Sequence, residues 1–382
     1  MRNANYILLL LISLCLPLCA NATILYDVID LGTLGGEDSC ARSVNESGQV
    51  VGASQDSSGR FRATLFDPTG GGNNVDLGAI SGSTTSQALY INDCGQIVGD
   101  CWIGGVGYQA TLFDPTGNGN NTALRPYTGF QNWAKSINNS GQIIGSCVGP
   151  GVAFKGYVAV AFDRGGNWWY DKRLGTLGGH ESRASSINDA GQIVGWAENP
   201  SGDRRATLFD PTGYGNNVDL GAAPGYSLSS AVSINEAGQI VGSVTDSSGH
   251  HRAALFDPTG TGYNIELGTI GGESSETLCI NDIGQIVGWA YDSLGRWHAV
   301  LFDPTGGGNN IDLNTLIDPD SGWTLKSACS INNHAWIVGQ GINPDGYTRG
   351  FLLKPIPEPA TIALLSLGAL FVTRRGKRAS AC

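Results

Sequence analysis

The stretch Ile91–Gly99 reads Ile-Asn-Asp-Cys-Gly-Gln-Ile-Val-Gly, and variants of it recur along the chain. Seven copies are present, 46 to 51 residues apart, and their asparagines are Asn45, Asn92, Asn138, Asn188, Asn235, Asn281 and Asn332. Self-similarity at a period of 20 to 50 residues is the signature of a repeat architecture. The repeat therefore decides the fold.

Each repeat contains four short strand candidates. In the first repeat they are Tyr26–Gly32, Ala41–Asn45, Gln49–Ala53 and Phe61–Phe66. Strands of about five or six residues joined by short connections account for the period. In the Asn-x-x-Gly turns, the asparagine side chain folds back on its own backbone and the glycine, Gly191 for example, takes a positive φ. Seven such sets predict an all-β fold, a seven-bladed β-propeller of four-stranded antiparallel blades.

Composition agrees with many short strands and tight turns. Of 382 residues 57 are glycine and only 14% are charged, and no long apolar stripe follows the helical period. A β-helix is the main rival fold, but its coils are usually much shorter than this repeat. Ring closure stays open at this point: either no strand is borrowed, or the first and last strands share one blade.

Residues 1–22 are predicted to be a secretory signal peptide. A basic start at Arg2 precedes an apolar run and the small-residue exit Ala20-Asn21-Ala22, so we expect cleavage near Thr23. A lipoprotein signal through Cys19 is the alternative, and the bulky Leu18, where a small residue is wanted, disfavours it. The repeats then occupy residues 23–355 and a tail occupies 356–382.

The tail has three parts in order. Pro357-Glu358-Pro359 precedes an apolar run over 360–372, and Arg374 and Arg375 begin a basic end. At ~1.5 Å per residue this run would span about 20 Å as a transmembrane helix, short of the ~30 Å hydrocarbon core. The arrangement resembles the PEP-CTERM sorting signal of Gram-negative bacteria. The resemblance implies recognition by an exosortase-type protease, transient anchoring in the inner membrane, and delivery to the cell surface or extracellular matrix.

The repeats themselves resemble the HAF extracellular repeats. The likeness rests on the Leu-Gly-x-Leu-Gly-Gly openings at Leu31–Gly36 and Leu174–Gly179, on the Ile-Asn-x-x-Gly core, and on the closing strands. The family is named for a His-Ala-Phe tripeptide, whereas a closing strand here reads Arg-Ala-Thr-Leu-Phe at Arg62–Phe66. The resemblance implies an exported repeat protein and transfers no activity to particular residues.

The net charge argues against nucleic acid as a partner, and the cysteines bear on disulfide formation. The net charge is −11, and removal of the five basic residues in the two end segments leaves 17 basic against 33 acidic residues, or about −16. Such a surface repels nucleic acid. Six cysteines lie within residues 23–355: Cys40, Cys94, Cys101, Cys147, Cys279 and Cys329. An exported location permits disulfides, and six cysteines allow fifteen pairings that the sequence alone leaves open.

The turns are expected to fall on two faces. Turns after the second and fourth strand candidates barely vary and are interpreted as structural, whereas turns after the first and third vary widely, as recognition loops do. The variable turns carry aromatic residues beside carboxylates, a combination that suits sugar rings. Trp133, Trp297 and Trp323 are the candidate ligand-binding residues, although packing of the aromatics between blades is an equally simple interpretation.

No catalytic or metal motif stands out. The sequence has no Gly-x-Ser-x-Gly and no His-Glu-x-x-His, and Asp67 with Asn73 and Asn74 suits a turn better than a calcium site. We therefore expect no enzyme, cofactor or metal, and an exported structural or binding scaffold. The alternatives are an enzyme or lectin-like propeller acting on extracellular polysaccharide, and a surface coat without ligand. Carboxylates converging on the channel mouth would favour an enzyme.

Overall fold

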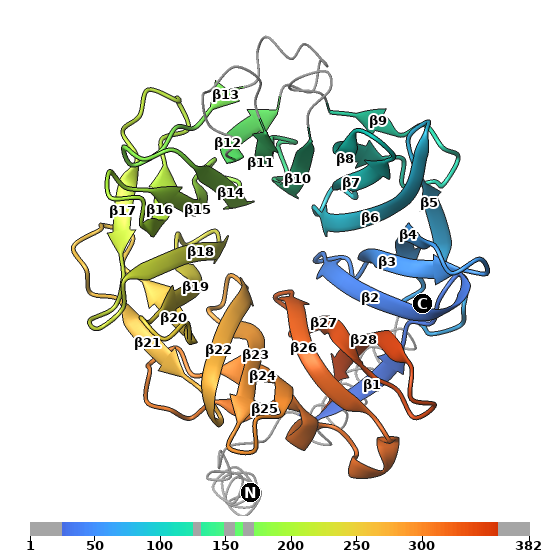
Figure 1. Ribbon diagram of the computed structural model, residues 1–382. Coiled ribbons are helices and arrows are strands. Elements are labelled where there is room, and N and C mark those ends of the chain that lie inside the picture. Colours follow the sequence, from blue (N-terminus) through green and yellow to red (C-terminus); the bar gives the residue numbers. More distant parts are fainter. Residues whose placement is uncertain (1–24, 125–130, 149–156, 163–171, 358–382) are drawn as a thin grey trace, which may run out of the picture. The chain divides into compact units, whose positions relative to one another are not determined.

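The computed structural model describes residues 25–124, 131–148, 157–162 and 172–357. Residues 28–354 form a seven-bladed β-propeller, and each blade is a four-stranded antiparallel sheet (Figure 1). The predicted fold is therefore confirmed. Besides strands, the described part of the chain has two short 3-10 helices, η2 (Leu313–Leu316) and η3 (Pro319–Ser321). In the flanking described residues, the Ile356 N–H donates to the Leu25 carbonyl at 2.8 Å.

In six blades the strands run from the central channel outward in chain order, and in the seventh β1 lies outermost, after β26, β27 and β28 (Figure 1). The first blade consists of β2(Gly35–Val44), β3(Val50–Asp56), β4(Phe61–Phe66) and β5(Val75–Gly78), and the second of β6(Ser83–Ile91), β7(Ile97–Ile103), β8(Gly107–Phe113) and β9(Thr122–Ala123). The third consists of β10(Asn132–Ile137), β11(Ile143–Val148), β12(Tyr157–Phe162) and β13(Lys172–Arg173), and the fourth of β14(Ser182–Ile187), β15(Ile193–Glu198), β16(Arg204–Phe209) and β17(Val218–Gly221). The others are β18(Leu228–Ile234), β19(Ile240–Thr245), β20(His251–Phe256) and β21(Ile265–Gly268); β22(Gly271–Ile280), β23(Ile286–Asp292), β24(Trp297–Phe302) and β25(Ile311–Asp312); and β26(Thr324–Ile331), β27(Ile337–Ile342) and β28(Thr348–Pro355) with β1(Tyr26–Asp30).

The first strand of the chain completes the last blade. The seventh sheet has the order β1-β28-β27-β26, and the Leu31 N–H beyond β1 donates to the Gly350 carbonyl of β28 at 3.0 Å. The sequence repeat is therefore offset from the blade by one strand. Of the two closures left open by the sequence, the shared blade is the one observed.

The last glycine of the repeat motif permits a close approach of two strands. The innermost strand of the first blade shifts register between Ala41 and Ser43, which brings its backbone against β3. A Cβ on Gly52 would lie 2.0 Å from the Cys40 carbonyl oxygen. The six equivalent glycines meet the same obstacle at 1.9–2.1 Å. Any side chain there would displace the inner strand, so the motif requires glycine.

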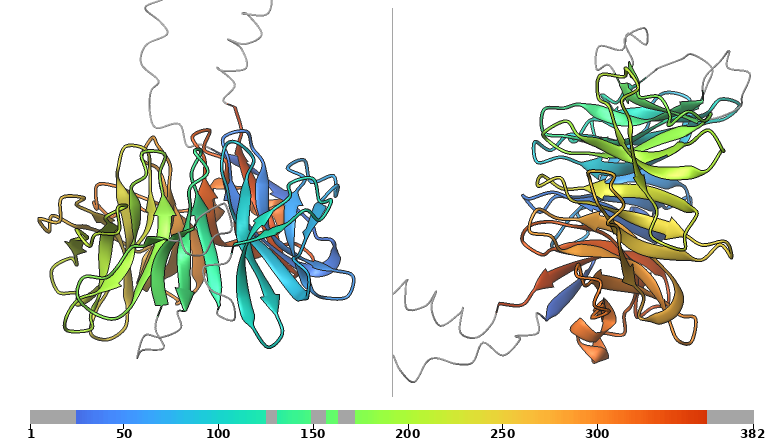
Figure 2. Two further views of the ribbon diagram at one scale, coloured as in Figure 1. Left: turned by 90° about the horizontal axis from the view of Figure 1, so that it is seen from above. Right: turned by 90° about the vertical axis from the view of Figure 1, so that its left-hand side faces the viewer.

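The hydrophobic core lies between neighbouring blades, which stand side by side when seen edge-on (Figure 2). Between the first two blades, Val51 and Leu77 pack with Ile91, Ile97 and Phe113. Two sets of loops frame the ring. Loops that follow innermost and third strands form what we call the asparagine face, and loops that follow second and outermost strands form the variable face, as the sequence predicts.

Candidate functional site

Seven buried asparagines form a closed ring of hydrogen bonds on the asparagine face. The Nδ2 of each donates to the backbone carbonyl of the asparagine in the next blade at 2.9–3.1 Å, and Asn332 donates to Asn45. The Oδ1 of Asn45 also accepts from the Gln49 N–H at 2.8 Å, which confirms the predicted turn. Asparagine fits because one short side chain donates to the neighbouring blade and accepts from its own.

A second closed ring lies one residue further along each turn. The backbone N–H of each member donates to the side chain of the next blade's member at 2.7–2.9 Å. Its five carboxylates and two amides belong to Glu46, Asp93, Asn139, Asp189, Glu236, Asp282 and Asn333. Burial, and then the neighbouring carboxylates, raise the pKa of Glu236. Within the described residues no group of three or more histidine, cysteine or carboxylate side chains is placed to hold a metal ion. The ring satisfies backbone N–H groups at the cost of like-charge repulsion.

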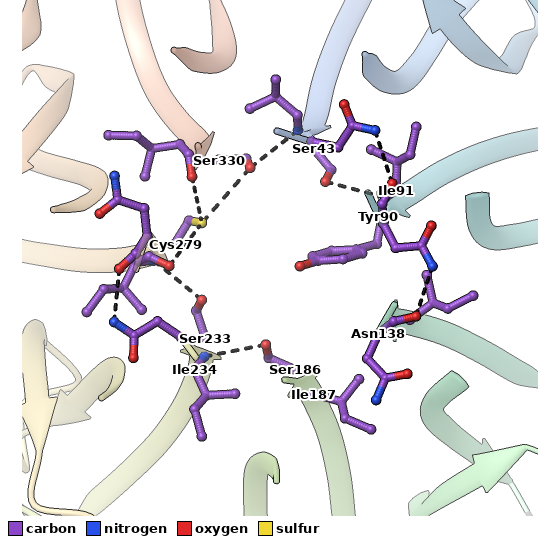
Figure 3. A pocket seen from close by; sticks show the side chains of 18 of the residues that line it. Ser43, Tyr90, Ile91, Asn138, Ser186, Ile187, Ser233, Ile234, Cys279 and Ser330 are labelled. Atoms are coloured by element: carbon purple, nitrogen blue, oxygen red, sulfur yellow. Dashed lines mark hydrogen bonds between the residues drawn. The ribbon is translucent and has the colours of Figure 1, made fainter. Parts of the chain in front are cut away.

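The channel behind these rings has a volume of about 490 Å³. Serine hydroxyls on the innermost strands join neighbouring blades there: Ser186 Oγ accepts from the Ile234 N–H and Ser233 Oγ from the Ile280 N–H, both at 3.4 Å (Figure 3). Tyr90 and Cys279 replace this serine in two blades. The Tyr90 ring points into the lumen (Figure 3), and burial raises its pKa.

A second cavity, of about 460 Å³, opens at the variable-face end and is called here the variable-face cavity. Residues of the first, second and seventh blades form its wall. They include the polar residues Asp38, Arg42 and Asp100 and the aromatic residues Trp102 and Tyr108. Two carboxyl groups, those of Asp38 and Asp100, therefore face one cavity. The sequence analysis asked whether carboxylates converge on the channel mouth, and these two residues share the lining of this cavity.

Asp100 is the most unusual group in this cavity. It lies on β7, is 1% exposed, and accepts from Gln87 Nε2 through Oδ1 at 3.0 Å. Its Oδ2 has no hydrogen-bond partner among the described residues. Burial raises the pKa of this carboxyl to about 6, although Lys135 and Arg42 favour its charged form. A carboxyl held neutral near pH 6 with a free oxygen is equipped to transfer a proton.

The basic side chains of Arg42 and Lys135 lie inside the ring of blades and still contact solvent. Arg42 lines both the channel and the variable-face cavity. Burial lowers the pKa of Lys135, while Asp100 favours its charged form. Arg42 and Lys135 thus supply positive charge beside a buried acid.

A row of aromatic rings continues from the cavity across the variable face. Trp102 and Tyr108 meet edge to face with centroids 4.9 Å apart, Tyr108 lies 5.8 Å from Trp133, and Trp133 lies 5.5 Å from Tyr157. The Arg183 guanidinium covers the Tyr157 ring at 3.4 Å. The second and third blades contribute the rings of this row, which places flat apolar surfaces beside the variable-face cavity.

The three predicted ligand-binding tryptophans are not brought together. Trp133 belongs to the aromatic row and contacts a wall residue of the cavity, Tyr108. Trp297 begins β24, is 43% exposed, and packs edge to face on Trp289 with centroids 5.5 Å apart. Trp323 precedes β26 and meets Phe351 at 6.3 Å. The ligand-binding role of all three stays a prediction.

Sequence reasoning missed Asp100, although a signal was present. It directly follows the last glycine of the second repeat motif. The equivalent residues in the other repeats are Ala53, Ser146, Trp196, Ser243, Trp289 and Gln340. Asp100 alone is charged in this series. An acid at a position that the repeat otherwise fills with uncharged residues is the mark that could have found it.

The other sequence predictions fall into two groups. Asp67 accepts from Thr69 and from Asn73 within its own loop, which agrees with a turn-forming role. Of the sorting residues, Pro357 is described and exposed, whereas Glu358, Pro359, Arg374 and Arg375 lie outside the described residues. So do the signal peptide and the apolar run 360–372. Among the residues that are described, no helix is long and apolar enough to cross a membrane.

Comparison with known proteins identifies the tail and one solved fold. Residues 355–378 match the PEP-CTERM protein-sorting motif, which confirms that predicted signal and marks the chain for export and membrane-anchored sorting. No curated protein matches the chain. Among solved structures, a gluconolactonase from Xanthomonas campestris is similar over 89% of this chain and 93% of its own, with 13% sequence identity and a TM-score of 0.41. The expectation of a non-catalytic structural or binding scaffold is corrected on this chain's own geometry, because Asp38 and Asp100 line one cavity.

Proposed function

We propose that this chain is an exported carbohydrate-active enzyme whose reaction centre is the variable-face cavity. The observation that carries the proposal is Asp100, a buried carboxyl whose Oδ2 has no hydrogen-bond partner among the described residues and which lines the same cavity as Asp38. Two carboxyl groups in different environments are what cleavage of a glycosidic bond requires. The proposal concerns this chain's own cavity and does not depend on the activity of any similar structure.

The two carboxyl groups take different roles. Asp100, whose pKa is raised to about 6, keeps its proton in mildly acidic solution and donates it from Oδ2 to the leaving oxygen. Asp38 is half-buried nearer the variable loops and acts as the carboxylate that assists attack at the sugar carbon. Gln87, which bonds the other oxygen of Asp100, orients the acid and does not touch substrate.

The aromatic row supplies a binding surface for the sugar chain. Trp102 is 38% exposed at the cavity wall, and the row continues through Tyr108 and Trp133 to Tyr157. Flat rings bury the apolar faces of pyranose units, while polar side chains on the cavity wall bind hydroxyls. An extended polysaccharide along this row would place one linkage over the cavity. This geometry favours cleavage within a chain rather than action on a free monosaccharide.

Turnover and binding are tested together on the full chain with a panel of extracellular oligosaccharides. We expect product from the wild type, a loss of at least 100-fold in kcat with retained binding in Asp100→Asn, and weaker binding in Trp102→Ala. Asp189→Asn on the asparagine face is the matched control and keeps activity. Full activity in Asp100→Asn would overturn the assignment of the acid.

A lectin-like propeller is the second candidate, and the aromatic row favours it. This function predicts binding without product in the wild type, unchanged binding in Asp100→Asn, and loss of binding on alanine substitution at Trp102. Binding lost at Trp297 or Trp323 instead would move the recognition surface to the sixth and seventh blades, which carry two of the three tryptophans that the sequence analysis named.

We also propose the route by which the protein reaches its substrate. The PEP-CTERM match at residues 355–378 supports recognition by an exosortase-type protease, with the signal peptide 1–22 directing export and the run 360–372 anchoring the chain transiently in the inner membrane. The cell surface or extracellular matrix is then the site of action. The likeness to HAF repeats stays a prediction consistent with this route.

A further inference from the structure

Two cysteine thiols meet where the ring of blades closes. Cys40 lies on β2, the innermost strand of the first blade, and Cys329 on β26, the innermost strand of the seventh. Their side chains are hydrogen-bonded to each other. The two strands are also joined by the Val44 N–H, which donates to Ser330 Oγ at 3.4 Å, so the thiols are held on adjacent backbones.

The surroundings activate one of the two thiols. Cys329 accepts hydrogen bonds from Cys40, from the Arg42 guanidinium, and from Ser327 Oγ at 4.0 Å. The Cys40 hydrogen bond, followed by the charge of Arg42, lowers the pKa of Cys329 to about 6 against the opposing effect of burial. The hydrogen bond with Cys329, and then burial, raise the pKa of Cys40. A thiolate beside a thiol and a cation is the arrangement of a reactive cysteine pair.

We infer that Cys40 and Cys329 form a disulfide in the exported protein and thereby link the first blade covalently to the seventh. The remaining cysteines fit this pairing poorly. Cys279, on the adjacent sixth blade, contacts Ser330 Oγ and the Ile331 carbonyl. Cys94 is exposed on the asparagine face, and buried Cys101 bonds Thr111 Oγ1. Of the fifteen pairings that the sequence leaves open, the structure selects the one across the ring closure.

The bond forms by thiol–disulfide exchange with an oxidised dithiol, the oxidant class of bacterial export compartments. The Cys329 thiolate attacks one sulfur of the oxidant, forms a mixed disulfide and releases the other sulfur as a thiolate. Cys40 loses its proton and attacks the Cys329 sulfur, which expels the second thiolate. The two cysteines lose two electrons and two protons in total, and the oxidant becomes a dithiol.

The disulfide would cross-link the propeller at the place where its ring of blades closes. The two cysteines are about 290 residues apart along the chain, and a cross-link that closes so long a loop removes much of the unfolded chain's freedom. Without the disulfide, the closure is held by non-covalent contacts: the pairing of β1 with β28 and the hydrogen bonds between the first and seventh blades, such as that from Asn332 to Asn45. Reduction should therefore release the first and seventh blades before the others.

Peptide mapping of the full chain, isolated from a bacterial periplasm without reductant, tests the pairing directly. We expect one linked peptide pair that contains Cys40 and Cys329, which dithiothreitol abolishes. In thermal unfolding, dithiothreitol should lower the Tm of the wild type by roughly 5–10 °C. Glutathione disulfide added to the reduced protein should restore both the linked pair and the Tm.

Matched variants separate the pair from its surroundings. Cys279→Ser should keep the linked peptides and the response to dithiothreitol, whereas Cys40→Ser should lose both. If Cys40→Ser does not fold, the wild-type peptide map still decides the matter. A Cys279–Cys329 link, or free thiols at Cys40 and Cys329 in protein isolated from the periplasm, would overturn the inference.

Discussion

The side-chain amide of Asn332 donates a hydrogen bond to the backbone carbonyl of Asn45 over 3.1 Å, although the two residues belong to the last and first repeats. Six equivalent bonds join the other neighbouring asparagines. The ring thus has no free end. Each asparagine side chain accepts a hydrogen bond from a backbone N–H of its own turn and donates one to a carbonyl of the next blade. Loss of any one member should cost the same.

Asn188→Ala tests this equivalence in the fourth blade. The substitution leaves the Gln192 N–H and the Asn235 carbonyl without their side-chain partners, and a buried unsatisfied group costs about 1–3 kcal/mol. We expect a loss of about 2–4 kcal/mol in the free energy of unfolding, measured by chemical denaturation. Asn216→Ala, an exposed asparagine that bonds only within its own loop, is the control and should change stability by less than about 1 kcal/mol.

Gly191 and Ala335 occupy the same turn position, and we expect Gly191→Val to lower the stability of the protein and Ala335→Gly to raise it. Both have positive φ, +78° for Gly191 and +56° for Ala335, and Ala335 is the sole non-glycine residue with positive φ in the described chain. Gly191→Val should cost about 2–3 kcal/mol because a branched side chain is strained there. Ala335→Gly should gain about 0.5–1 kcal/mol. Calorimetric Tm values that move the same way in both variants would contradict the turn assignment.

Asp100→Asn should change how stability depends on pH. A carboxyl whose folded pKa is raised to about 6, from 3.8, contributes stability below pH 4 that is lost as pH rises through 6. At about 1.4 kcal/mol per unit, the wild type should lose about 3 kcal/mol relative to the variant between pH 4 and pH 8. Denaturation of both proteins across this range measures the difference, and parallel profiles would show that Asp100 is not buried as described.

Glu236→Gln should relieve repulsion in the acidic ring. Glu236 accepts the Asp189 N–H, and glutamine keeps that acceptor while removing the charge that Asp189 and Asp282 oppose. We expect a Tm rise of about 1–2 °C at low ionic strength that shrinks in concentrated salt. Glu37→Gln, on the variable face, is the control. A gain that does not depend on salt would rule out repulsion as its cause.

The sorting signal predicts a shortened C-terminus. In a host with the matching protease, intact-mass analysis should show loss of the tail after the Pro-Glu-Pro region, within the segment that matches the sorting motif. Glu358→Ala should leave the tail in place and the protein in the membrane fraction. A full-length C-terminus on mature wild-type protein would refute removal of the tail.

The period of the repeat was enough to predict the blades. Four strands per repeat and positive φ at the turn glycine follow from local rules, and the boundaries of Phe61–Phe66 match β4. The second use of the asparagine, to bond the next blade, was not predictable, because a single repeat does not reveal what lies beside it. Ring closure was undecided for the same reason: β1 pairs with a strand more than 300 residues later.

The site was less accessible to sequence reasoning than the fold. Aromatic residues suggested a binding face, yet Trp102 and Tyr108 line the cavity while Trp297 and Trp323 lie elsewhere. The acid was missed because Asp100 carries no motif. Its role depends on burial and on the neighbouring Gln87 and Arg42, which come together only when two blades pack.

The place of β1 in the seventh blade has a consequence for vectorial translocation. If the predicted signal peptide leads the chain across the membrane, β1 emerges first, although it pairs in the finished ring with β28, which emerges last. Until β28 has emerged and paired with it, β1 has no partner strand, and unpaired strand edges promote aggregation. We therefore expect the protein to need a periplasmic holding chaperone whose release is timed by arrival of the C-terminal strand.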